Sequence, residues 1–320
     1  MPDAAPDKFF PVSQEDALKR LDVLLAEKAG LSRSQIKKFI DAGLVTINSK
    51  PAGKTGEKLK EGDIITLPDG TAEVSGSAAL IPEHIPLNIL YKDDYIIVVD
   101  KPAGLVVYPA VGHPRGTLMN ALAFYTGGKL ASIGAPLRAG VVHRLDKDTS
   151  GVMVVAVDDK AYYGLLPQFK NRTISRSYLA LVHGKPAKAE GVIDLPIGRS
   201  ISDRKKMSVR SRAGRKAITR WKLIESFSYV ASLIEAKLGT GRTHQIRVHM
   251  AASGHPVLGD STYGKKTAVE FRGKKILIPR QMLHARTLGF KHPISGEDME
   301  FSSPVPEDMA GVIETLRNMT

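Results

Sequence analysis

The chain has 320 residues, of which 46 are Lys or Arg and 33 are Asp or Glu, so its formal net charge at neutral pH is +13. This balance makes nucleic acid the first partner to consider, and 42% hydrophobic residues exclude a disordered tail protein. The absence of cysteine excludes disulfides, thiolate zinc sites and thiol nucleophiles. No apolar run approaches the ~18 residues of a membrane span, and the acidic start lacks the order of a secretory signal. We therefore expect a cytoplasmic protein of about two domains.

The charge is unevenly distributed along the chain. Residues 1–80 hold 11 basic and 12 acidic side chains, a net of −1, which leaves about +14 for residues 81–320. The stretch 70–81 is mostly small or polar and has no periodicity, as is typical of a linker. These features predict an N-terminal tail at 1–15, a small domain at 16–69, a linker at 70–81 and a larger domain at 82–320.

The small domain has the pattern of two helices followed by short strands. Leucines at helical spacing predict a helix over Ala17–Ala29. A capping-box signature at Ser32 predicts a second helix over Arg33–Ala42. Alternation in LVTIN (Leu44–Asn48) and the run IITL after a Gly-Asp turn predict two strands.

The segment RLDVLLAEKAGLSRSQIKKFIDAGLVTINSKPAGKTGEKLKEGDII resembles a small RNA-binding domain first described in a ribosomal small-subunit protein. In that family the second helix and the following loop lie against the RNA backbone. The resemblance therefore implies phosphate contacts for Arg33, Lys37, Lys38 and Lys54. From the charge pattern alone, a helix face that is merely solvated is an alternative. Gly53-Lys54-Thr55 is similar to the end of a nucleotide phosphate loop, but Asn48 replaces the first glycine of that loop, so no nucleotide cofactor is expected.

The most informative segment of the larger domain is VVHRLDKDTSGVMVVAVD. A polar loop from His143 to Gly151 interrupts two apolar runs that we interpret as core strands, and it holds two carboxylates, Asp146 and Asp148. Loops held by rigid strands commonly carry chemistry. The pattern alone leaves two alternatives open, a catalytic site and a turn that Asp side chains stabilise.

A second informative segment, AKLGTGRTHQIRVHMAASGHPVLGD, has a Gly-rich entry into a helix predicted over Thr243–Ser253. His244 and His249 lie five residues apart and no acidic ligand accompanies them, so no metal site is expected. Main-chain carbonyls are the expected partners of most histidines here. Arg242 would lie at the helix start, where the helix dipole disfavours a cation, so it should have a carboxylate or phosphate partner.

With these motifs the chain is identified as a member of the RluA-type pseudouridine synthase family, and it is most similar to members that modify large-subunit ribosomal RNA. HRLDKDTSG is the family's central motif, and four other stretches agree in order: VVDKPAGLVV, SYLALVHG, GTGRTHQIRVHMAASGHPVLGDSTYG and LHARTLGFKHPISG. The resemblance implies an α+β fold, in which a mixed, largely antiparallel sheet with flanking helices and a central cleft forms the catalytic domain. A small α/β RNA-binding domain precedes it. The implied reaction isomerises uridine and needs no cofactor and no metal.

The family's functional residues fall on particular positions of this sequence. The essential aspartate falls on Asp146, the active-site tyrosine on Tyr178, the arginine that pairs with the aspartate on Arg242, and the apolar residue that packs on the base on Leu283. His143, Arg144 and Leu145 would support the motif loop, and Asp148 would order it. Because the uridine must leave a stacked helix, we expect base flipping.

A flipped base requires a firm hold on the RNA backbone. Residues 199–220 carry nine basic side chains and one acidic one, so a basic loop is expected to contact phosphate or sugar through Arg204, Lys205 and Lys206. A solvated hairpin is the alternative. The expected partner is large-subunit ribosomal RNA or a pre-ribosomal particle, with no membrane. Two other functions stay open: the same reaction on transfer RNA or a mixed set, and a nonenzymatic ribosomal-RNA-binding assembly factor.

Overall fold

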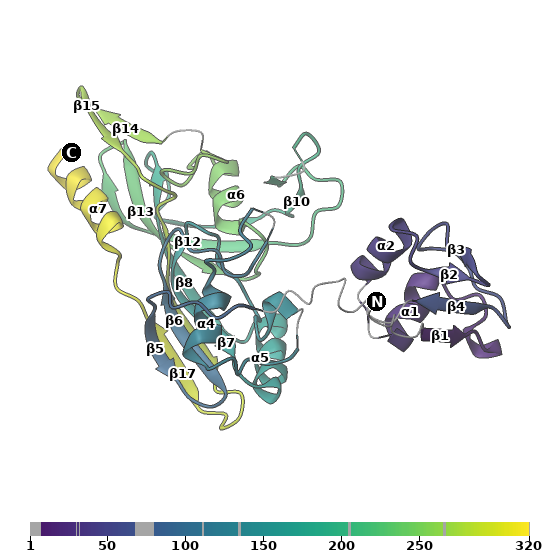
Figure 1. Ribbon diagram of the computed structural model, residues 1–320. Helices are drawn as coiled ribbons and strands as arrows, with labels where there is room; N and C mark the ends of the chain where they lie inside the picture. Colours follow the sequence, from purple (N-terminus) through teal and green to yellow (C-terminus); the bar gives the residue numbers. More distant parts are fainter. Residues whose placement is uncertain are drawn as a thin grey trace. The chain divides into compact units, whose positions relative to one another are not determined.

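The computed structural model describes residues 8–29, 31, 33–67, 80–110, 112–133, 136–203, 206–264 and 267–319. The chain divides into two compact units, residues 1–79 and residues 80–320 (Figure 1). Residues 70–79 of the predicted linker lie outside the described residues. No helix among the described residues is long and apolar enough to span a bilayer.

The N-terminal unit packs two helices, α1 (Leu21–Ala29) and α2 (Arg33–Asp41), together with an antiparallel sheet. A short 3-10 helix, η1, precedes them at Gln14–Asp16. The sheet has the order β1-β4-β2-β3, and its strands are β1 (Lys8–Pro11), β2 (Thr46–Ile47), β3 (Lys50–Pro51) and β4 (Ile64–Leu67). Leucines of α1 and apolar residues of α2 are buried against one another, as their helical spacing predicts. The first helix starts later than predicted because Leu18 has a left-handed backbone (φ 69°) and is 72% exposed.

Residues Lys8–Pro11 fall in the predicted tail but form a strand in the structure. This strand, β1, pairs antiparallel with β4, from Lys8 opposite Leu67 to Pro11 opposite Ile64. The segment KFFP shows no clear alternation because the strand lies at the sheet edge and is mostly exposed. The structured N-terminal unit therefore includes residues that precede position 16.

The larger unit, residues 80–320, corresponds to the catalytic domain that the resemblance implies and is named the catalytic unit. It is built on one nine-stranded sheet with the order β5-β6-β7-β16-β8-β13-β12-β9, and β17 also pairs with β16. Every pair is antiparallel except β7 with β16. The strands are β5 (Asn88–Lys92), β6 (Ile96–Lys101), β7 (Ser150–Ala156), β8 (Ser175–His183), β9 (Glu190–Asp194), β12 (Ile218–Phe227), β13 (Ala231–Leu238), β16 (Leu283–Lys291) and β17 (Asp298–Ser302). This architecture confirms the predicted mixed, largely antiparallel sheet with a preceding small domain.

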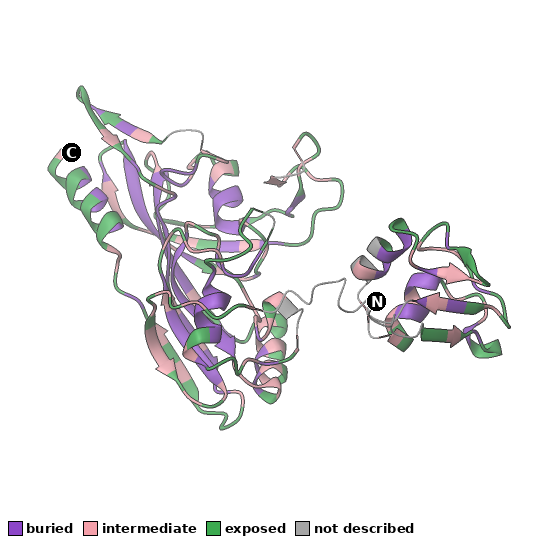
Figure 2. Cartoon of the chain, in the orientation of Figure 1, coloured by how far each residue is buried: buried purple, intermediate pink, exposed green. Residues whose placement is uncertain are grey.

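Helices cover both faces of this sheet. On one face α4 (Leu118–Tyr125) and α6 (Gln245–Ala252) contribute to a core that includes Tyr178, Ala180 and Val182 of β8. On the other face α5 (Asp159–Asn171) covers the end near β7, and α7 (Glu307–Met319) packs on Leu179 and Leu181 of β8. Successive β8 residues thus serve opposite cores, as strand geometry requires. Figure 2 shows the central strands buried between these layers.

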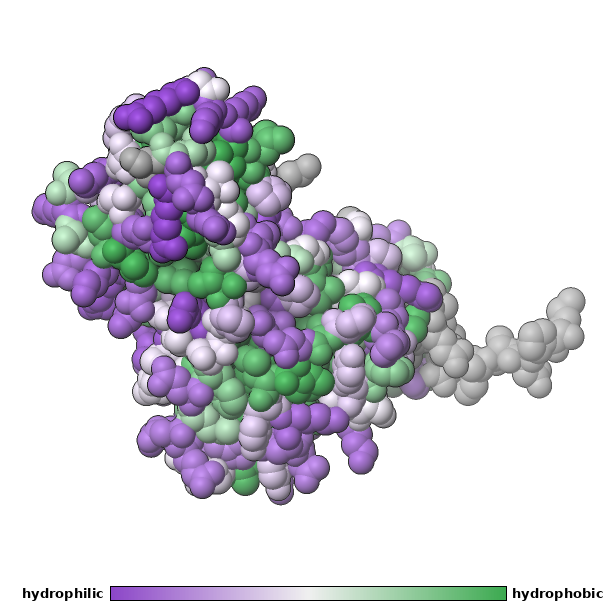
Figure 3. Space-filling model, turned by 90° about the vertical axis from the view of Figure 1, so that its left-hand side faces the viewer, coloured by the Kyte–Doolittle hydropathy of each residue, from purple (hydrophilic) through white to green (hydrophobic). Residues whose placement is uncertain are grey.

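Two small hairpins and one 3-10 turn complete the catalytic unit. The 3-10 turn η2 spans Pro136–Arg138. The first hairpin is β10 (Gly198–Arg199) with β11 (Met207–Ser208), and the second is β14 (Ala268–Phe271) with β15 (Lys274–Leu277). Figure 3 views the catalytic unit from the side that carries α7, where hydrophilic side chains surround smaller apolar areas.

Candidate active site

The HRLDKDTSG loop leads directly into β7, near the middle of the sheet. Residues 141–146 have no regular structure, so the strand predicted before the loop is not formed. The Thr149 N–H donates to the Asp146 carbonyl (3.1 Å) and makes a turn. Gly151 has φ +114°, and a Cβ there would lie 2.1 Å from the Ala285 carbonyl oxygen. A glycine is therefore required where β7 first pairs with β16.

Three side chains of the motif anchor the loop on the N-terminal side of Asp146. His143 accepts a hydrogen bond from the Val154 N–H through Nε2 (3.1 Å) and stacks on Phe169 at 4.5 Å. Burial lowers the pKa of His143 to about 3, so the imidazole is neutral. Leu145 is buried in the core beneath the loop, while exposed Arg144 donates to the Tyr108 hydroxyl. These contacts connect the loop to β7, to the core and to Tyr108.

Lys101, at the end of β6, is hydrogen-bonded to the backbone of the HRLDKDTSG loop. Its side chain is completely buried, and its Nζ donates to the carbonyl oxygens of Pro102 (2.8 Å), Leu105 (2.9 Å) and Lys147 (3.0 Å). Burial lowers the pKa of Lys101 to about 7, and the nearby Asp148 carboxylate opposes this shift. The backbone between the two aspartates is thereby tied to the strand next to β7.

Replacing Lys101 by Met is expected to lower the free energy of unfolding of the catalytic unit by about 1–3 kcal/mol, because three carbonyls lose a donor. Trp221 is the only tryptophan of the chain and lies on β12, so its fluorescence reports this transition in urea. Lys147→Met, at an exposed side chain of the same loop, is the control and should leave the midpoint unchanged. If Lys101→Met proves at least as stable as wild type, Lys101 does not hold the loop as described.

Asp146 is held by Arg247 of α6. Arg247 donates to the Asp146 Oδ2 at 3.0 Å and makes two hydrogen bonds to the buried Asp260, of 2.7 and 2.9 Å. Burial by itself would lower the pKa of Arg247, but the Asp260 and Asp146 carboxylates raise it above its ordinary value. Asp260 also accepts from the backbone N–H groups of Thr262 and Tyr263. Arg247 is therefore permanently charged and fixed in orientation, and it fixes Asp146 in turn.

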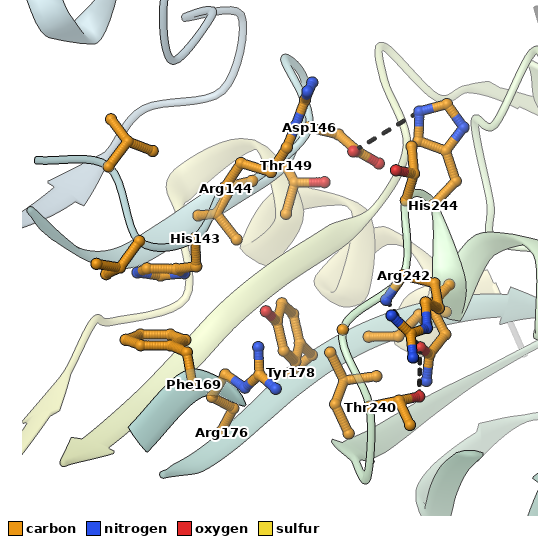
Figure 4. A pocket seen from close by; sticks show the side chains of 18 of the residues that line it. His143, Arg144, Asp146, Thr149, Phe169, Arg176, Tyr178, Thr240, Arg242 and His244 are labelled. Atoms are coloured by element: carbon orange, nitrogen blue, oxygen red, sulfur yellow. Dashed lines mark hydrogen bonds and ion pairs between the residues drawn. The ribbon is translucent and has the colours of Figure 1, made fainter. Parts of the chain in front are cut away.

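The other oxygen of Asp146 makes no hydrogen bond within the described part of the chain. The Nε2 of His244 lies 3.7 Å from Oδ1, the approach that Figure 4 marks with a dashed line. Burial lowers the pKa of His244, so this imidazole is neutral near pH 7 and the contact is not an ion pair. The Nδ1 of His244 lies 2.7 Å from the Tyr263 hydroxyl. Asp146 thus has one oxygen held in place and one with free lone pairs.

The predicted ion pair between Arg242 and Asp146 is wrong. Arg242 donates through Nε to the Lys216 carbonyl (3.2 Å), and its backbone N–H donates to the side-chain oxygen of Gln245 (3.0 Å). The helix starts at Gln245 instead of Thr243, since His244 has a left-handed backbone (φ 57°). Arg242 consequently lies before the helix, and the inward position belongs to Arg247. The sequence signal was the flanking pair Ile246 and Val248, which indicates that Arg247 is buried and needs a partner.

Tyr178 and Leu283 lie on the sheet beneath this loop. Tyr178 of β8 pairs with Ala236 of β13 and with Ala285 of β16, both of which have small side chains. Leu283 is two residues from Ala285 on the same face, and both Tyr178 and Leu283 are buried in the core below the loop. Burial raises the pKa of Tyr178. Its hydroxyl has no hydrogen-bond partner among the described residues.

These residues line a cavity of about 620 Å³, which Figure 4 shows from close by. A volume of that size is typical of a small-molecule site. Of the described residues that form its lining, Asp146 is the sole carboxylate, whereas the cations are Arg138, Arg144, Lys170, Arg172, Arg176, Arg215, Arg242 and Arg247. Burial lowers the pKa of Arg242, and the neighbouring Arg215 and Arg172 lower it further. The cavity is therefore suited to bind a polyanion that inserts one uncharged group into it.

The predicted RNA-contact residues are only partly described. In the N-terminal unit Lys37 is exposed and pairs with Asp41 on the next turn of α2 (2.8 Å), and Lys54 is exposed in the loop after β3. In the catalytic unit the Lys206 Nζ lies 3.6 Å from the Asp203 Oδ2. The side chains of Arg33 and Lys38, and residues Arg204 and Lys205, lie outside what the structure describes.

Several histidines are hydrogen-bonded to main-chain carbonyls, as the sequence suggested. His249 is bonded to the Leu195 carbonyl (2.9 Å) and the Thr219 hydroxyl (2.9 Å), and His255 to the His183 carbonyl (2.9 Å). Burial lowers the pKa of His249. Among the described residues, no group of three His, Cys, Asp or Glu side chains is placed to hold a metal ion.

Comparisons with known proteins agree with this architecture. Residues 95–252 match the RNA pseudouridylate synthase family, and residues 19–65 match the S4 domain. The chain is 44% identical over 316 residues to ribosomal large subunit pseudouridine synthase D of Zymomonas mobilis, covering 97% of this chain and 98% of that protein. It is also 42% identical over 306 residues to the uncharacterized RNA pseudouridine synthase YlyB of Bacillus subtilis, covering 95% and 96%.

A solved structure of a human protein is also similar to this chain. The human RNA pseudouridylate synthase domain containing 1 superposes with a TM-score of 0.55 at 27% identity, covering 73% of this chain and 96% of that one. The chain thus belongs to the RNA pseudouridine synthase family and carries an S4 domain at its N terminus. It is an enzyme that isomerises uridine in RNA.

Proposed function

We propose that the chain isomerises specific uridines of large-subunit ribosomal RNA, free or within a pre-ribosomal particle, and that Asp146 is the essential group. The observation that supports the catalytic role is the carboxylate itself, with one oxygen fixed by Arg247 and the other free toward the cavity. Support for the target comes from relatives that are named ribosomal large subunit pseudouridine synthase D. A cytoplasmic location is likewise part of the proposal for this chain.

The reaction breaks the bond between ribose and the ring nitrogen, turns the uracil, and joins it again through C5. The free Asp146 oxygen either attacks the sugar or the ring, or takes a ribose proton. Each route uses the carboxylate as an anion, and Arg247 holds that carboxylate in place. The target uridine is flipped out of the stack into the cavity, at a cost of a few kcal/mol. Leu283 packs on the base, and Tyr178, once its own proton has been drawn off, takes the C5 proton at the end.

The many cations around the cavity fit the phosphates next to the flipped nucleotide, because they face one carboxylate only among the described residues of the lining. The S4 domain would add a second hold on the RNA. In it, Lys37 and Lys54 are exposed and suited to phosphate contact.

Replacing Lys37 and Lys54 together by Gln is expected to weaken RNA binding and to reduce the salt slope of log Kd by about 1.4–1.8, since two phosphate contacts are lost. The measurement is Kd for a large-subunit RNA fragment at a series of salt concentrations. Lys160→Gln, at an exposed position of α5, is the control for net charge. An unchanged slope in the double variant would show that these two lysines do not contact RNA.

The substrate itself is tested by offering unmodified large-subunit ribosomal RNA and a transfer RNA pool to the enzyme in parallel. Isomerisation of the ribosomal RNA alone supports the proposal. Preference for transfer RNA would favour the alternative substrate, for which no feature of the described cavity argues specifically.

A further inference from the structure

Arg176 shares the floor of the cavity with Tyr178. The two residues are separated by one position on β8, so their side chains project from the same face of the sheet. Both line the cavity, and Figure 4 shows them next to each other below the loop of Asp146. In the mechanism proposed above Arg176 has no role.

The Arg176 guanidinium has no carboxylate partner among the described residues. Its Nε is buried and makes no hydrogen bond. Packing holds the group instead. The guanidinium carbon of Arg176 lies 5.8 Å from the centroid of the Phe169 ring, and the His143 ring stacks on Phe169 with the two centroids 4.5 Å apart. The backbone of Gly241 closes the site, because a Cβ at Gly241 would lie 3.3 Å from an Arg176 nitrogen.

The Arg176 side chain is half-buried with its Nε fully buried. A partly desolvated cation without an anion is costly, and the cost is offset when negative charge appears next to it. Burial raises the pKa of Tyr178, the Asp146 carboxylate raises it further, and Arg176 lowers it. Among the charged groups that act on this hydroxyl, Arg176 is thus the one that favours its ionised form. The cations at the cavity rim, such as Arg144 and Arg172, are exposed and better placed for phosphates.

We propose that Arg176 is a positioning residue whose positive charge stabilises the Tyr178 phenolate that removes the C5 proton of the rearranged base. In this step the C5–H bond breaks, the proton passes to the phenolate oxygen, and the C5–H electron pair restores the ring double bond. The electron pair displaced from the C6–N1 double bond goes to N1, which takes up a proton from water, and Tyr178 returns its own proton to water, so the overall reaction stays an isomerisation. The inference rests on the proposed function, in which Tyr178 receives this proton.

The test is single-turnover isomerisation by the full-length enzyme at saturating enzyme concentration, with large-subunit RNA carrying either protium or deuterium at C5 of uridine. Arg176→Gln should slow the reaction about 10- to 100-fold, because the Tyr178 phenolate loses the positive charge that favours it. The slow reaction should show a primary deuterium isotope effect, and Kd for RNA should stay within several fold. Arg176→Lys keeps the charge and should recover most of the rate.

Arg220→Gln removes a cation from an exposed position of β12 and controls for net charge, while Trp221 fluorescence checks that each variant is folded. The proposal is overturned if Arg176→Gln retains the wild-type rate, if it changes Kd alone, or if its slower rate carries no isotope effect. Equal losses in Arg176→Lys and Arg176→Gln would also overturn it, because charge would then not matter. Failure of wild type to form pseudouridine in this RNA would instead count against the proposed function.

Discussion

Asp146→Asn is expected to lower the rate of pseudouridine formation by at least about 10³-fold, within the range that a catalytic acid or base contributes, while Kd for RNA changes by no more than several fold. Asn has nearly the same volume as Asp, so the packing of the loop is kept. It lacks the negative charge that a nucleophile or base needs. Single-turnover rates and Kd measured on the same RNA separate the two effects.

Asp148→Asn is the matched control for this prediction. Asp148 lies in the same loop, and its backbone carbonyl, not its side chain, accepts the hydrogen bond from Arg280 (3.0 Å). We expect activity within several fold of wild type. If binding falls in proportion to activity in Asp146→Asn, then Asp146 is an RNA contact or a structural residue, and the catalytic assignment is mistaken.

The second large effect is expected at Arg247. Arg247→Gln should lower the rate by about 10²-fold or more, because Asp146 loses the charged partner that orients it. The same change leaves the buried Asp260 without its cation, which typically costs about 3–5 kcal/mol of stability. Rates should therefore be measured well below the unfolding temperature of the variant.

Arg242→Gln distinguishes the two arginines. Arg242 is bonded to a backbone carbonyl at the edge of the cavity, so its loss is expected to weaken RNA binding and to leave the single-turnover rate within several fold at saturating enzyme. The opposite pattern, with Arg242→Gln inactive and Arg247→Gln nearly normal, would restore the ion pair that the sequence suggested and contradict the geometry described above.

Arg242 and Arg247 illustrate which parts of the site could be predicted from the sequence and which could not. The family resemblance that the motifs carry was sufficient for the fold class, for the N-terminal RNA-binding domain and for expecting Asp146, Tyr178 and Leu283 in one site, and all three line the same cavity. The partner of Asp146 depended on where α6 begins. A left-handed residue, His244, shifts that start by two positions. Positive φ is uncommon for every residue except glycine, even though histidine adopts it more often than most, so the shift is not predicted from sequence.

Groups that act across the fold were also missed. Asp260 meets Arg247 from the turn after α6, and Lys101 reaches the motif loop from 46 positions earlier in the chain. In the sequence nothing distinguishes Arg176 from other basic residues, and its role is indicated only by the cavity that it lines together with Tyr178. None of these contacts has a local sequence signal, because each is made by tertiary packing and not by a repeat or a turn.

The most direct test of the central claim is site-resolved pseudouridine mapping on unmodified large-subunit ribosomal RNA, by carbodiimide labelling and primer extension, with wild type and Asp146→Asn side by side. The account predicts new primer-extension stops at specific uridines with wild type and none with Asp146→Asn. Stops of equal strength with both proteins would contradict the role of Asp146, and stops with neither would contradict the proposed substrate.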